Sequence, residues 1–182
     1  EESGLDLKIE YGQFGSEEKM LLNFIEFWAD PDNTPDVITG WNKRFIDIPY
    51  MVARMSHVVG DKMTQKLSTW GMLRAGEVKI MGRSLPTMDI IGIASLDYMD
   101  LFKKFAYTYG NQESYSLNHI ASVVLGDKKL DYSETGSLRN LYEADFRLFV
   151  DYNIKDVELI ERFEEKLGLI NLVSTMAYMG GV

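Results

Sequence analysis

The sequence contains no cysteine, and this absence excludes several classes of function. Disulfide bonds, thiolate zinc sites and cysteine nucleophiles all need a sulfur atom that the chain does not have. A chain without disulfides also suits a reducing compartment, and we therefore expect a cytoplasmic location.

Long apolar runs are missing as well. The longest run lies near residues 90–96, whereas a membrane-spanning helix needs about 20 apolar residues. The first residues show no basic segment followed by an apolar one. We therefore expect neither a signal peptide nor a membrane partner.

Basic residues are in the minority, and the net charge is −9. This charge argues against a broad phosphate-binding surface. It still allows a small nucleic-acid site in which clustered carboxylates hold divalent cations, because bound cations invert the local field. The chain has only two histidines, each on a predicted amphipathic helix, where a lone histidine is usually structural or exposed. Serine-nucleophile, P-loop and dinucleotide motifs are absent from the sequence. Carboxylates therefore are the candidate catalytic groups.

The order of the predicted elements indicates one α/β domain over residues 1–182, with a small mixed sheet flanked by helices. Apolar periodicity, capping residues and turn residues predict the strands and helices. Strands are expected at residues 5–11 and 36–40, and a hairpin is expected over residues 77–98 with its connection at 82–86. Helices are expected at residues 16–30, 49–60, 62–70, 114–126, 137–153 and 154–178.

Two features of the sequence contain candidate catalytic carboxylates. Asp47 stands where a predicted strand gives way to a helix, and helix capping alone would explain an aspartate there. Tyr152 and Asp156 are four residues apart and share one face of a predicted helix, which a solvated polar surface would also explain. Each feature alone is unremarkable, but together they resemble parts of one signature.

Four ordered segments carry that resemblance: TGWNKRFIDIPY, SLDYMDLFKKF, SYSLNHIA and YNIKDVELI. In this order the chain resembles the 3′–5′ exonuclease domain of family B DNA polymerases, and in particular the replicative polymerases of T-even-type tailed phages. The similarity runs from about residue 14 to residue 182. It implies a ribonuclease H-like fold, a proofreading role in DNA replication and a location in the host cytoplasm.

The resemblance also implies the chemistry. Mismatched nucleotides would be removed from the 3′ end of single-stranded DNA with two divalent ions, Mg²⁺ or Mn²⁺. Asp47 and Asp156 would be metal ligands, and Tyr152 would hold the attacking water.

Three other residues would have roles near the substrate. Lys129 would neutralise charge on the phosphate. Asn42 and Phe45 would lie near the substrate strand. The connection at residues 82–86 matches a hairpin implicated in strand separation.

The sequence departs from the family pattern in two places. Ile46 stands before Asp47, where the family usually has phenylalanine. The first exonuclease motif, an Asp-x-Glu pair on the leading strand of the domain, is not found ahead of Asp47, and neither are the segments of the polymerase domains found. We therefore expect the fold to lack its leading strands and the isolated chain to have little or no activity.

Two alternatives stay open. In the first, the chain is a non-catalytic piece of a split polymerase that docks with a partner fragment carrying the first motif, whereas in the main interpretation its partners are the other polymerase domains. An exposed sheet edge would favour such pairing, or homo-oligomers. A ribonuclease H-like nuclease of another kind, such as a resolvase, is disfavoured by the acidic balance and by the Tyr-x-x-x-Asp spacing.

Overall fold

The computed structural model describes residues 10–80, 82–126 and 138–181. The chain forms two compact units. One comprises Glu1–Asp36 and Ile48–Ile93, and the other comprises Val37–Asp47 and Ala94–Val182. The strand predicted at residues 5–11 and the predicted site residue Lys129 fall wholly or mostly outside the described residues.

The first unit contains helix α1 (Glu17–Ala29), which begins as the sequence predicts. The Oγ atom of Ser16 caps the helix by accepting a hydrogen bond from the backbone N–H of Lys19. Leu21 and Ile25 are buried on one face. The unit also contains most of α2 (Asp47–Val59) and the short helices α3 (Asp61–Thr64) and η1 (Gln65–Leu67).

The predicted hairpin is present, but its connection is shorter than expected. Strands β2 (Leu73–Ile80) and β3 (Arg83–Ile90) pair antiparallel, with Ile80 opposite Arg83. The connection predicted at residues 82–86 is therefore wrong. Pro86 lies inside β3 opposite Glu77. Proline is tolerated there because both strands of a two-stranded sheet are edge strands, where a missing N–H can face solvent.

The second unit contains a separate parallel pair. Strand β1 (Val37–Gly40) pairs with β4 (Ala94–Asp97), with Gly40 opposite Asp97. The hairpin predicted to extend to residue 98 therefore ends earlier, at a turn where Gly92 has a φ of 95°. The strand predicted at residues 36–40 is present as β1, but none of its residues is buried, and the core of this unit is formed mainly by helices.

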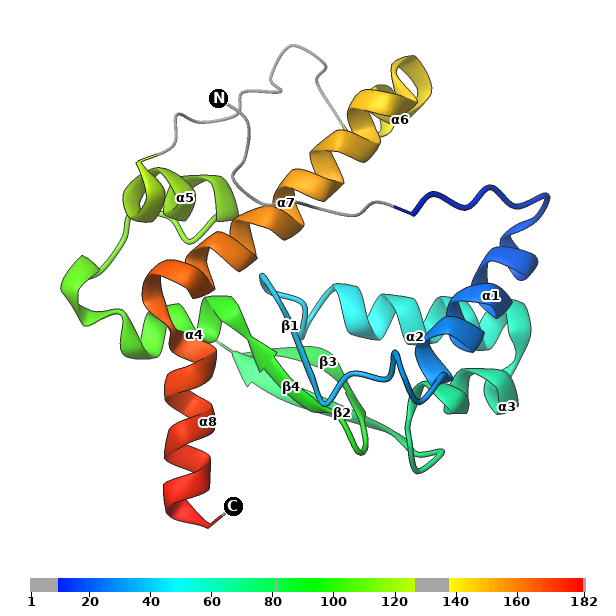
Figure 1. The fold of residues 1–182 in the computed structure, drawn as a ribbon, viewed down its shortest axis with the longest axis horizontal. Coiled ribbons are helices and arrows are strands. Elements are labelled where there is room, and N and C mark those ends of the chain that lie inside the picture. Colours follow the sequence, from blue (N-terminus) through cyan, green and yellow to red (C-terminus); the bar gives the residue numbers. More distant parts are fainter. Residues whose placement is uncertain (1–9, 81, 127–137, 182) are drawn as a thin grey trace. The chain divides into compact units, whose positions relative to one another are not determined.

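The core lies among helices α4 (Tyr98–Phe105), α5 (Leu117–Leu125), α7 (Phe146–Leu167) and α8 (Leu169–Gly180). Figure 1 shows α7 as a long helix between α6 (Leu138–Ala144) and α8. Buried side chains from all four helices meet, among them Phe102, Ile120, Phe163 and Leu169. The predicted α/β fold with strands flanked by helices is confirmed, but the described strands form two separate two-stranded sheets where a single small mixed sheet was expected.

The boundary predicted between the last two helices, at residues 153 and 154, is wrong. Helix α7 continues through that point, and the breaks fall at Asp145 and Gly168. The Oδ1 atom of Asp145 accepts a hydrogen bond from the N–H of Leu148 at 3.0 Å and so starts α7. Gly168 ends α7 in the left-handed conformation, with a φ of 61°.

Across the described part of the chain, every helix is too short or too polar to cross a bilayer.

Candidate functional site

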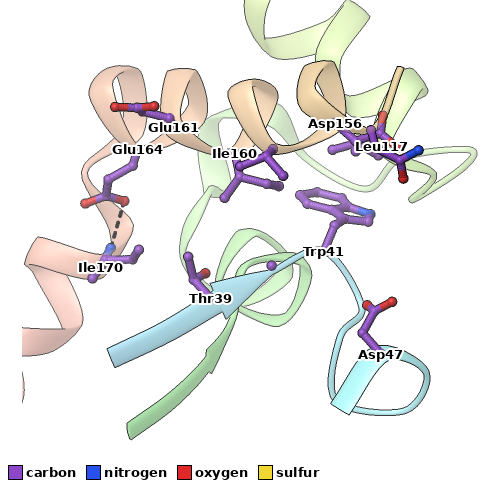
Figure 2. Close-up of a pocket in the computed structure, with 12 residues that line it drawn as sticks. Thr39, Trp41, Asp47, Leu117, Asp156, Ile160, Glu161, Glu164 and Ile170 are labelled. Carbon is purple, nitrogen blue, oxygen red and sulfur yellow. Dashed lines mark hydrogen bonds between the residues drawn. The ribbon is translucent and has the colours of Figure 1, made fainter. Parts of the chain in front are cut away.

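A pocket of about 660 Å³ lies within the second unit, a size that suits a nucleotide-sized ligand. The end of β1 and the corner after it, residues 41–47, form one wall, and α7 forms another. Asp47 and Asp156 both line the pocket, and Figure 2 shows them on these two walls with the indole of Trp41 drawn between them. The structure therefore places the two carboxylates that the sequence singled out on the lining of one pocket.

Asp47 is the first residue of α2, at or beside the cap position that the sequence predicts. The residue is exposed, yet its carboxyl lies at the pocket wall. Partial desolvation raises the pKa of this carboxyl, and the nearby charge of Asp97 acts in the same direction, while Lys43 opposes it. The helix start gives a carboxylate at this position a favourable local dipole.

Asp156 lies on α7 and is half-buried, and burial raises the pKa of its carboxyl. Tyr152 lies one turn earlier on the same helix, as the spacing predicts. Tyr152 is half-buried but is not among the residues that line the pocket.

Asn42 and Phe45 are also outside the pocket lining. Asn42 has a φ of 59°, a left-handed conformation that asparagine tolerates better than most residues. Phe45 is half-buried, and the guanidinium carbon of Arg44 lies 5.5 Å from the centre of its ring.

Asp97 holds the corner in place, a role that the sequence analysis missed. Its side chain is only 7% exposed. Its carboxylate accepts hydrogen bonds from the backbone N–H groups of Asn42, Arg44 and Met99, at 3.0, 3.1 and 3.1 Å. The position of Asp97 at the end of a predicted strand, inside one of the four quoted segments, was the available signal.

Glu164 lines the pocket, but its carboxylate is already engaged. It accepts hydrogen bonds from the hydroxyl of Tyr98 and from the backbone N–H groups of Ile170 and Asn171. Burial, followed by the charge of Glu164, raises the pKa of the Tyr98 hydroxyl well above its usual range. Glu164 therefore caps α8 and is unsuited to binding a ligand.

Trp41 forms part of the apolar wall of the pocket. Its Nε1–H donates to the carbonyl of Tyr115 at 2.9 Å, and its ring centre lies 5.7 Å from that of Phe163. The indole is thus fixed between the pocket and the core.

The donor set of the pocket suits a hard divalent cation, because Asp47 and Asp156 offer carboxylate oxygens. The described residues contain no group of three histidine, cysteine or acidic side chains arranged to hold a metal ion. Asp47 and Asp156 alone fall short of such a group, so a cation bound here would need further ligands.

Comparison with known proteins gives a consistent result. The model of the exonuclease domain of DNA polymerase family B matches residues 4–120. The chain is 36% identical to the DNA-directed DNA polymerase of Escherichia phage RB69 and 33% identical to that of Enterobacteria phage T4. Each alignment covers 94% of this chain but 18% of the phage protein. The DNA polymerase delta catalytic subunit of Glycine max is 27% identical over 93% of this chain and 16% of its own length.

Proposed function

The chain belongs to the exonuclease domains of family B DNA polymerases, and on that basis we propose that its pocket is a 3′–5′ exonuclease site for the end of single-stranded DNA. The observation that carries the proposal is that Asp47 and Asp156, far apart in the sequence, line one pocket. Capping or surface solvation alone would give no reason for both carboxylates to line the same pocket.

The two carboxylates would hold a divalent cation, Mg²⁺ or Mn²⁺, with the remaining ligands coming from outside the described residues or from substrate. A bound cation of this kind supplies charge stabilisation and a more acidic water molecule. Without the cation the carboxylates would repel the phosphates of DNA, so we expect binding of DNA to depend on it.

The other residues would act on the substrate or on water. Trp41 and Ile160 give the pocket an apolar wall that would lie against a sugar or base and limit the access of bulk water. The hydroxyl of Tyr152 would orient the attacking water, and for this role the hydroxyl must come close to the scissile phosphate. Lys129, Asn42 and Phe45 keep their proposed contacts with the phosphate and the substrate strand.

Activity of the chain by itself should be weak, because no Asp-x-Glu pair precedes Asp47 to complete a two-metal site. Proofreading within a whole polymerase would engage the other polymerase domains as partners, in the cytoplasm of the host cell. The chain spans less than a fifth of the length of the phage relatives described above.

Binding of a fluorescent single-stranded oligonucleotide tests the proposal without requiring turnover. We expect Mn²⁺ to raise the affinity for the oligonucleotide at least tenfold in the wild-type chain and to have little effect in Asp47→Ala or Asp156→Ala. Glu165→Ala, an exposed change on the same helix as Asp156, is the control and should behave as wild type. Equal affinity with and without Mn²⁺ in the wild type would contradict the proposal.

A further inference from the structure

Lys43 is a buried cation in the corner between β1 and α2. Its side chain is 4% exposed, which is rare for a lysine. The Nζ atom donates a hydrogen bond to the Oγ atom of Ser95 on β4. The aliphatic stem packs across Gly40, where an added Cβ would come within 3.2 Å of the Lys43 Cδ atom.

The ammonium group lies within the field of two carboxylates. Desolvation lowers the pKa of Lys43, while the charges of Asp97 and then Asp47 oppose that change. No ion pair within 4.0 Å involves Lys43 among the described residues. Asp97 is satisfied by three backbone N–H groups. The lysine is therefore not needed to complete the hydrogen bonds of Asp97.

We propose that Lys43 is a positioning residue whose buried ammonium group serves as the internal counter-charge of the Asp47 corner and lowers the affinity of that corner for divalent cations. The inference rests on the proposed function, since it takes Asp47 as a metal ligand. Its physical basis is Coulombic. A fixed positive charge beside a metal-binding carboxylate opposes the arrival of a second cation, and burial shields this effect from salt.

Calorimetric titration with Mn²⁺ tests the inference. Lys43→Met keeps the stem that packs on Gly40 but removes the charge, and should bind Mn²⁺ about 3- to 10-fold more tightly than wild type. Lys43→Gln, also neutral and able to bond Ser95, should shift the affinity in the same direction. Lys43→Arg keeps the charge and should resemble wild type. Lys104→Met removes an exposed charge from α4 and should change nothing, because solvent screens it.

A rise in affinity separates this role from a merely structural one, since damage to the corner would lower metal affinity. Affinity that is unchanged or lower in both neutral variants would overturn the inference, and so would absence of Mn²⁺ binding in all of these proteins. If binding is lost in Asp47→Ala while the neutral variants match wild type, only the inference about Lys43 fails. If binding survives in Asp47→Ala, the proposed function fails at that residue, and the inference fails with it.

Discussion

The backbone N–H of Asn42 donates a 3.0 Å hydrogen bond to the Oδ1 atom of Asp97, and this bond ties the end of β4 to the corner that follows β1. The same carboxylate accepts from Arg44, two residues further along the corner. The corner leads directly into Asp47. A buried carboxylate with no proposed catalytic role thus fixes the segment that presents the proposed metal ligand.

Replacing Asp97 by alanine should lower the free energy of unfolding by about 2–4 kcal/mol, because three backbone N–H groups lose a charged acceptor in a buried site. Urea unfolding followed by circular dichroism measures the change. Asp100→Ala, at an exposed position in the first turn of α4, is the control and should cost less than about 1 kcal/mol. Similar losses for the two variants would refute the role of Asp97.

Glu164→Ala should destabilise the chain by about 1–3 kcal/mol, since Tyr98 and the start of α8 lose their acceptor. The neighbouring Glu165 is exposed, so Glu165→Ala should leave the unfolding midpoint nearly unchanged. Mn²⁺ affinity should stay within twofold of wild type in both variants. A large loss of Mn²⁺ binding in Glu164→Ala would show that this carboxylate is a ligand after all.

Gly168→Ala should destabilise the chain by about 1–2 kcal/mol through backbone strain alone. Its φ is 61°, and an added Cβ would meet no atom within 4 Å. Gly15→Ala also meets open space but has no such φ, so it should be neutral or stabilise by up to about 1 kcal/mol through the unfolded state. Thermal unfolding of both variants compares them, and equal effects would argue against strain at Gly168.

Trp41 should report on ligand binding, because it lines the pocket while Trp28 and Trp70 lie in the other unit. Adding a single-stranded oligonucleotide with Mn²⁺ should change the intrinsic fluorescence of the wild type. The change should persist in Trp28→Phe and Trp70→Phe and disappear in Trp41→Phe. If Trp41→Phe retains the full change, the ligand binds elsewhere.

Local chemistry explains which parts of the fold were predictable. Ser16 and Gly126 mark helix ends through capping and the left-handed conformation, and both helices were predicted from these signals. The break at Asp145 was missed because α6 ends at Ala144 and α7 begins at Phe146, so the helical pattern runs on with a single residue between the two helices. The edge position of Pro86 depends on which strands pair, and that is set by the whole chain.

The candidate site, like the fold, was predictable from the sequence only in part. Asp47 and Asp156 were chosen from residue type and from an ordered resemblance, and they line one pocket. The burial of Lys43 has no sequence signal, because lysines are usually exposed and nothing local distinguishes this one. Asn42 was expected near the substrate strand. In the structure the backbone N–H of Asn42 donates a hydrogen bond to Asp97, and this bond depends on how β1 and β4 pair.

Calorimetric titration of the wild type with Mn²⁺, compared with Asp47→Ala and Asp156→Ala, tests the central claim most directly. The account predicts binding in the wild type that is weakened at least tenfold in each variant, because both carboxylates contribute to one site. Binding that either change leaves intact would contradict the account. Asp47 would then be only the first residue of a helix, and Asp156 only a half-buried residue on α7.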